Sequence, residues 1–254
     1  MIVIRHKLPT GARFAKWLRA AWFPRQYRQI LRGLRANGWR YCPPLDDAEF
    51  ARALYPWLLQ YYLLGKEQES RAARIMAERR RKGIGDLIDR LSTPEGVVAA
   101  VWAGAKWLAR ALNKTTRKIV TGVLTAIGFM QTIPAFAEEP QAIAPIRPQE
   151  AAEIIARAVI DPQRSRTISQ NESSRMWHKG RLEVQKDLGM LRRWNVAEDE
   201  RVCPICLPLA GKAVKPDEYF AVVDGEIIWN PPAHTRCRCD VSTFVFDTAV
   251  AVGI

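Results

Sequence analysis

Five thiol and imidazole side chains near the C-terminal end constrain this chain more than any other feature. Cys203-Pro-Ile-Cys206 puts two thiols on one tight turn, and His234-Thr-Arg-Cys237-Arg-Cys239 supplies three more donors about 30 residues later. Structural zinc takes four tetrahedral nitrogen or sulfur ligands. The sequence therefore predicts a structural zinc ion held by four of five candidates, without choosing among them: Cys203, Cys206, Cys237, Cys239 and His234.

The segment between the two donor clusters carries the strongest strand signal in the chain. Residues 219–229 contain two β-rich runs on either side of Asp224-Gly225, a dipeptide that favours a tight hairpin because both turn positions need positive φ. A hairpin here folds the chain back and brings the two clusters together. Loops and a hairpin of this size bury too little apolar surface to fold alone, so the cation is expected to act as a staple.

Three other uses of the cysteines stay open. Cys-Pro-Xaa-Cys also occurs as a redox pair, although that use expects a βαβ context, and here an acidic segment precedes Cys203 and Pro208 follows it. The thiols can also pair as disulfides. A catalytic zinc would need one open coordination position and a general base, for which Asp199, Glu200 and Asp240 are the neighbouring carboxylates.

The positive charge of the chain is concentrated at its N-terminal end. Residues 1–40 hold ten Lys and Arg and no acid, which leaves only +3 of the net +13 for all other residues. Apolar residues recur at helical spacing over 13–22, where Pro24 is expected to close the run, and again over 24–34. Residues 1–45 are thus predicted to form a basic amphipathic arm, either as packing helices with solvated basic faces or as a surface for an anionic partner. The candidate contact residues are Arg13, Lys16, Arg19, Arg25, Arg28, Arg32 and Arg35.

Residues 46–137 are predicted to form a helical domain. Asp46 with Glu49 is typical of a capping box at the start of a helix, and Ser92-Thr93-Pro94-Glu95 opens a later one. Residues 119–137 carry no charge and are long enough to span a bilayer, but their Gly, Gln and Pro residues favour a buried core helix ending near Gln131.

The chain after residue 137 is predicted to divide into a linker and a terminal module. Residues 138–149 are rich in proline and read as a linker, and Pro148 suits the first turn of the helix that follows. A long helix is expected from about Arg164 to Leu191. The predicted fold is mainly α, with a small C-terminal α+β zinc-binding module that contains the hairpin, within residues 150–254.

The order of several motifs adds a family resemblance. Arg166-Thr-Ile-Ser-Gln-Asn-Glu172 is followed by Trp194, by Asp199-Glu-Arg-Val-Cys203-Pro-Ile-Cys206, by Leu209-Ala-Gly211, and lastly by Pro231-Pro-Ala-His234-Thr-Arg-Cys237-Arg-Cys239. Over about residues 105–245 this succession resembles the phage Mu F-like minor head proteins, also called the phage head morphogenesis family. One departure is Asn171-Glu172, where the family commonly has Thr-Glu.

The resemblance implies a structural protein of a tailed-phage head and not an enzyme. Such a protein is expected in the virion, inside the capsid near the portal vertex, after assembly in the host cytoplasm, where it supports head morphogenesis and DNA packaging or delivery. The implied partners are the portal protein, with the major capsid or a scaffolding protein as further candidates, and packaged DNA bound without sequence preference; a membrane is not expected. A basic face suits packed DNA because Lys and Arg bind phosphates and release counterions.

Two other functions stay open as alternatives. A zinc-dependent hydrolase or nuclease would use the basic arm to guide DNA and a carboxylate beside the metal as the base. A membrane-active ejection protein would use residues 119–137. The apolar run at the N-terminus is too short for a secretory leader, so the thiols are expected to meet a reducing cytosol during folding.

Overall fold

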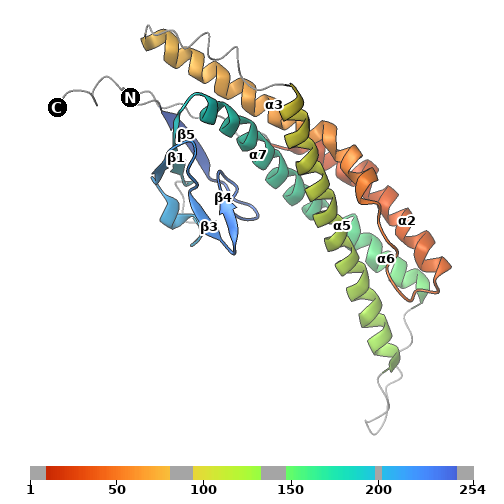
Figure 1. Ribbon diagram of the computed structural model, residues 1–254. Coiled ribbons are helices and arrows are strands. Elements are labelled where there is room, and N and C mark those ends of the chain that lie inside the picture. The colour runs from red at the N-terminus through yellow and green to blue at the C-terminus, as the bar shows by residue number, and fades with distance from the viewer. Residues whose placement is uncertain (1–9, 81–93, 133–146, 198–201, 245–254) are drawn as a thin grey trace. The chain divides into compact units, whose positions relative to one another are not determined.

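The computed structural model describes residues 10–80, 94–132, 147–197 and 202–244, and it is mostly helical with a small C-terminal sheet region (Figure 1). The helices are α1 (Ala12–Trp17), α2 (Phe23–Ala36), α3 (Asp47–Arg80), α5 (Pro94–Thr132), α6 (Pro148–Val159) and α7 (Pro162–Asp187). The strands are β1 (Leu191–Asn195), β2 (Ala213–Val214), β3 (Ala221–Val223), β4 (Glu226–Ile228) and β5 (Asp240–Phe244). The predicted helical class with a C-terminal sheet region is confirmed.

The chain divides into two compact units that are interleaved in sequence. One unit comprises Met1–Gly11, Tyr55–Trp102 and Thr167–Ile254, and the other comprises Ala12–Leu54 and Ala103–Arg166. Helices α3, α5 and α7 each contribute residues to both units. The predicted boundaries after residues 45, 137 and 149 stay a prediction, and residues 138–146 of the predicted linker lie outside the described part.

One prediction for the unit that contains α1 and α2 is wrong: the helix was expected to end at Pro24, but it continues past this residue. A π-helical turn, Leu18–Trp22, joins the two helices, and the Phe23 N–H bonds to the Leu18 carbonyl five residues earlier. This wider turn accommodates the proline, which lacks an N–H and crowds the preceding turn of an ordinary helix. The chain is therefore continuously helical from Ala12 to Ala36, and its apolar stripe is buried, with Phe14 and Ile30 fully inaccessible to solvent.

A set of buried and part-buried polar contacts joins the helices of this unit. The Gln26 amide donates to Asn113 of α5 at 2.6 Å, and the Asn113 amide donates to Asp47 at 2.7 Å. The Arg164 guanidinium donates to the Thr116 hydroxyl at 2.7 Å. Because buried polar groups are costly without partners, these contacts fix how the helices of the unit pair.

Helix α5 begins at Pro94, as predicted, and ends at Thr132, next to the predicted end at Gln131. Its predicted burial is only partly met: of residues 119–125, Val120 is buried and the others are exposed or half-buried, while the side chains of 126–132 lie outside the described part. Among the described helices, none combines the length and apolar character that crossing a membrane requires.

In the other unit, α3 and α7 approach so closely that two glycines are required. A Cβ on Gly65 would overlap the Trp177 carbonyl oxygen of α7, and a Cβ on Gly180 would overlap the Tyr62 carbonyl oxygen of α3. Each neighbour is backbone and cannot move aside as a flexible side chain can. The long helix α7 therefore packs against α3 at backbone contact distance.

The prediction that α7 continues to Leu191 is wrong. The helix ends at Asp187, and Gly189 follows with φ of +61°, while the Met190 N–H bonds to the Gln185 carbonyl at 2.8 Å. This is the usual way in which a glycine after the last turn ends a helix. Leu191 instead opens β1, the central strand of an antiparallel sheet with order β2-β1-β5, which was not predicted.

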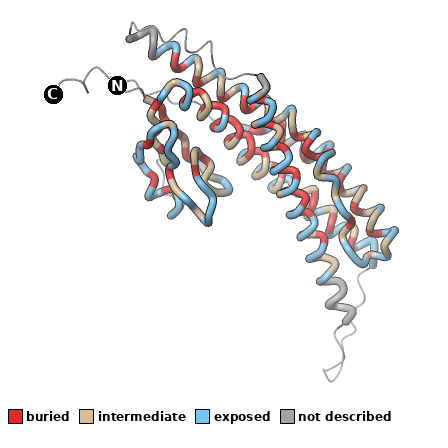
Figure 2. Tube along the Cα trace, in the orientation of Figure 1, coloured by how far each residue is buried: buried red, intermediate tan, exposed pale blue. Residues whose placement is uncertain are grey.

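The predicted hairpin is confirmed as β3 and β4, joined by Asp224 (φ 50°) and Gly225 (φ 80°). It forms a two-stranded sheet of its own. Its inner face completes a small core around Trp194 and Phe220, whose ring centroids lie 5.1 Å apart. Figure 2 shows buried and exposed positions mixed along these short strands, as expected where one face packs and the other meets solvent.

Candidate metal centre

The five predicted donor side chains converge in the structure. Cys203 and Cys206 lie on the turn that leads into the short 3₁₀ helix Leu207–Leu209, and the other three lie on the loop that enters β5. They form two triads that share Cys206, namely Cys203/Cys206/His234 and Cys206/Cys237/Cys239, and within each triad all ligand atoms lie within 4.8 Å of one another. All five cysteines of the chain are free of disulfide bonds.

The first turn is held by backbone hydrogen bonds that present both sulfurs on one side. The N–H groups of Cys206 and Leu207 bond to the Cys203 carbonyl at 3.1 and 3.0 Å. The Cys206 N–H also lies 3.3 Å from the Cys203 Sγ. Donation from a backbone N–H to sulfur stabilises a thiolate, which is the form that binds metal.

His234 is oriented for coordination through Nε2. Its Nδ1 lies 2.8 Å from the Thr235 carbonyl oxygen, and because a carbonyl only accepts, Nδ1 carries the proton. The lone pair of Nε2 then faces Cys203 Sγ at 2.9 Å and Cys206 Sγ at 3.2 Å. Metal-binding histidines commonly have their second nitrogen tied down in this way.

In the second triad the electrostatics favour the loss of one thiol proton, from Cys237, and oppose the loss of a proton from Cys206 or Cys239. Hydrogen bonding from Cys239, first through its thiol and then through its backbone N–H, lowers the pKa of the Cys237 thiol to about 5. Burial raises the pKa of Cys206 to about 12, and the hydrogen bond to Cys237 raises the pKa of Cys239. Several buried thiolates need a compensating cation, and a divalent ion bound here would supply it.

One pair of donors in the cluster has the spacing expected for two ligands of a tetrahedral ion. Two thiolates on zinc at about 2.3 Å lie about 3.8 Å apart, and Cys206 Sγ lies 3.7 Å from Cys237 Sγ. Within the described residues no four donors lie mutually within 4.8 Å, so the set of four stays a prediction, as does zinc itself. Cys206, which belongs to both triads, is the donor that joins the two clusters.

The sheet anchors both halves of the cluster. Cys206 and Cys239 are buried, and both belong to the apolar cluster that includes Trp194, Phe220 and Val241. Among the described residues this core has eight buried side chains, with seven half-buried ones packed against them. A core of this size is small for a module with two short sheets, and a shared ion would add a cross-link to it.

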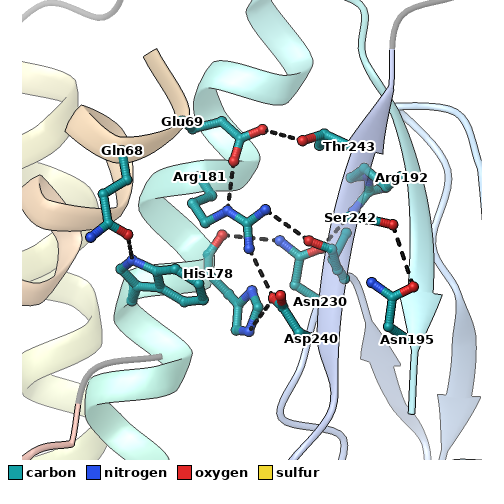
Figure 3. Close-up of polar contacts among 12 residues, drawn as sticks. Gln68, Glu69, His178, Arg181, Arg192, Asn195, Asn230, Asp240, Ser242 and Thr243 are labelled. Carbon is teal, nitrogen blue, oxygen red and sulfur yellow. Dashed lines mark hydrogen bonds and ion pairs between the residues drawn. The ribbon is translucent and has the colours of Figure 1, made fainter. Parts of the chain in front are cut away.

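A buried ion network, which the sequence interpretation missed, connects β5 to two helices (Figure 3). Arg181 of α7 donates from Nε to Glu69 of α3 at 2.6 Å, from Nη1 to the Asp240 carboxylate at 2.9 Å, and from Nη2 to the Val241 carbonyl at 2.7 Å. The second Glu69 oxygen accepts from the Thr243 hydroxyl at 2.6 Å. Since Asp240 follows Cys239 directly, this network positions the strand that leads out of the donor loop.

One feature of the sequence could have indicated this network. Arg181 sits at helical spacing from Trp177 and Val184, which are both fully buried, so a cation occupies an apolar stripe. Its partner Glu69 is 112 residues away in the chain, and no local pattern links the two. The pairing also occupies Asp240, a predicted base of the enzymatic alternative; Asp199 and Glu200 lie outside the described residues.

A second buried arginine ties the hairpin to the central strand. Arg192 of β1 donates to the carbonyls of Trp229 at 2.6 Å and Lys215 at 3.1 Å, to the Asn230 side chain at 3.0 Å and to the Glu218 carbonyl. Burial lowers its pKa to about 10. The backbone carbonyls on either side of the hairpin are thereby held by one cation.

The predicted contact residues of the basic arm all lie on the surface. They are, in order, Arg13, Lys16, Arg19, Arg25, Arg28, Arg32 and Arg35, and every one is exposed. The four on α2 recur every three or four residues and so form one stripe, of which Arg25 pairs with Glu49. This exposure agrees with both predicted uses of the arm, and the partner stays untested.

Comparison with known proteins gives one match. A family profile described as "Phage Mu protein F like protein" matches residues 139–242, which contain the five candidate donors and leave residues 1–138 outside. The predicted resemblance is confirmed, although the match begins later than the predicted residue 105. No curated protein and no solved structure matches the chain.

Proposed function

Because residues 139–242 belong to the phage Mu protein F-like family, we propose that this chain is a minor head protein that docks at the portal vertex inside a tailed-phage head. That family is one of structural phage head proteins, and the match therefore supports a role in head morphogenesis and a place in the virion. Docking at the portal and support of DNA packaging or delivery are the finer parts of the proposal.

The observation that carries the proposal is the convergence of the five donors inside the matched region. A structural zinc ion bound there would take Cys206 with three of the other donors and would supply charge compensation and a cross-link, with no reaction step. The module it closes has a small core, and a rigid module can present a docking surface at lower entropic cost than loose loops.

The exposed arm supplies the second part of the proposal. Seven cations on α1, the π-helical turn and α2 offer phosphate contacts without sequence preference, which suits a protein beside packaged DNA. The portal protein, the major capsid protein and a scaffolding protein are the candidate protein partners.

Metal analysis and portal capture of the purified full chain test the docking role. Cys206→Ser should lose the metal, lower the melting temperature and abolish capture by the portal protein of the same phage, while most helical circular dichroism remains. Cys42→Ser is the matched control, because Cys42 is a half-buried thiol outside both triads. Capture that survives in metal-free Cys206→Ser protein would exclude the staple role, and a wild-type chain that does not bind portal would exclude docking.

A further inference from the structure

The hairpin β3–β4 presents an aliphatic pair to solvent. Val222 and Ile227 are direct cross-strand partners, and their side chains are 54% and 53% exposed. The opposite face, with Ala221 and Ile228, packs on the core around Trp194. The face with Ala221 and Ile228 therefore fixes the hairpin on the core, and the face with Val222 and Ile227 exposes two large apolar side chains to solvent.

The surroundings of this pair are acidic, in contrast to the chain as a whole. Residues 216–229 hold four acids and no Lys or Arg, whereas the chain carries a net charge of +13. The four are Asp217, Glu218, Asp224 and Glu226, and all are exposed. An apolar face with acidic flanks is repelled by nucleic-acid phosphates and is attracted by a basic protein surface that contains an apolar side chain.

Helix α5 carries a surface of that chemistry. Trp107 is 50% exposed, and Arg110, Lys114 and Lys118 recur after it every three or four residues, all exposed. After Glu95 this helix contains no acidic residue. The stripe is thus a large apolar side chain in line with three cations, with the charge opposite to that of the hairpin.

We propose that the hairpin of one copy docks on the Trp107–Lys118 stripe of a second copy. Val222 and Ile227 would cover the Trp107 ring, and the hairpin acids would face the three cations. Aromatic and arginine side chains carry much of the binding energy of such contacts. The two surfaces differ, so the contact is heterologous and produces either a closed ring or an open chain of copies. This self-association goes beyond the proposed function and does not depend on it.

Sedimentation velocity of the nucleic-acid-free full chain over a range of concentrations tests the contact. The wild type should self-associate, and high salt should weaken the association because opposite charges face each other. Val222→Asp with Ile227→Asp, or Arg110→Glu with Lys114→Glu, should each weaken it about tenfold or more. Circular dichroism and melting temperature verify that the variants remain folded.

Mixing the two disabled proteins gives the sharpest result. Each retains one intact surface, so an equimolar mixture should form a 1:1 dimer that does not grow further. Arg28→Glu with Arg32→Glu makes the same charge change on α2, and Ile154→Asp changes an exposed aliphatic on α6; both should associate like the wild type.

A wild type that stays monomeric would overturn the proposal, as would hairpin variants that associate normally or a mixture that forms no dimer. If the α5 charge reversals abolish binding to a short DNA duplex and leave self-association unchanged, the stripe is a nucleic-acid surface and the proposal is equally overturned. Controls that lose association to the same degree would show that net charge alone drives it, with the same consequence.

Discussion

Replacement of Arg181 tests how the C-terminal sheet is held. The Arg181 and Glu69 side chains are both fully buried, and the guanidinium donates at 2.6, 2.9 and 2.7 Å to Glu69, Asp240 and the Val241 carbonyl. Arg181→Met keeps an apolar stem of similar length and leaves the Glu69 carboxylate buried with the Thr243 hydroxyl. Removing one partner of a buried ion pair costs about 3–5 kcal/mol, because the other charge stays uncompensated.

Urea denaturation followed by tryptophan fluorescence measures this loss, since Trp177 and Trp194 are buried in the same unit. The double variant Arg181→Met/Glu69→Leu removes both charges and should recover most of the stability, because an apolar pair of similar volume often replaces a buried ion pair at little cost. A single variant that loses less than about 1 kcal/mol, or a double variant as unstable as the single, would refute the reasoning.

Three more predictions concern other sites. Burial raises the pKa of the Glu172 carboxyl above its ordinary value of 4.5, against the effect of the neighbouring Arg175, so the wild type loses stability as the pH rises from that ordinary value through the raised pKa. Glu172→Gln has no proton to lose, so its stability relative to wild type in urea denaturation should grow over the same rise in pH, whereas a constant difference would contradict this. Gly65→Ala should cost about 1–3 kcal/mol in thermal unfolding, because the added methyl meets the backbone of α7. Gly122→Ala has open space around it inside α5 and should stabilise the protein by up to about 1 kcal/mol, because Ala favours the helix. Arg28→Glu with Arg32→Glu should lower the slope of log affinity for duplex DNA against log salt by about 2, and an unchanged slope would show that the α2 stripe makes no phosphate contacts.

The elements that were predicted correctly depend on local chemistry. Asp224-Gly225 accepts positive φ at both turn positions, and Pro94 and Pro148 each stand in the first turn of a helix. The errors arise where the structure that the local sequence favours differs from the one that the fold requires. Pro24 does not end the helix, because the π-helical turn before it makes room for the proline ring. Leu191 belongs to a strand because Gly189, two residues earlier in the chain, has already ended α7.

The same division holds for the candidate metal site. The sequence alone predicts the types of donor and the two short spacings, because soft ligands that are close together in sequence must also lie close in space. The sequence did not predict that both triads share Cys206, since this depends on how the loop before β5 folds back on the earlier turn.

By itself, then, the sequence determined the helical class, the hairpin, the five donors and the resemblance to the phage Mu protein F-like family over residues 139–242. Only the tertiary structure decided that β1 lies between β2 and β5, that Gly65 and Gly180 bring α3 and α7 to backbone contact, and that Arg181 pairs with Glu69. Hydrophobic periodicity and turn residues act over a few neighbours, whereas these contacts join segments from about 20 to about 120 residues apart, which become neighbours only when the backbone has packed.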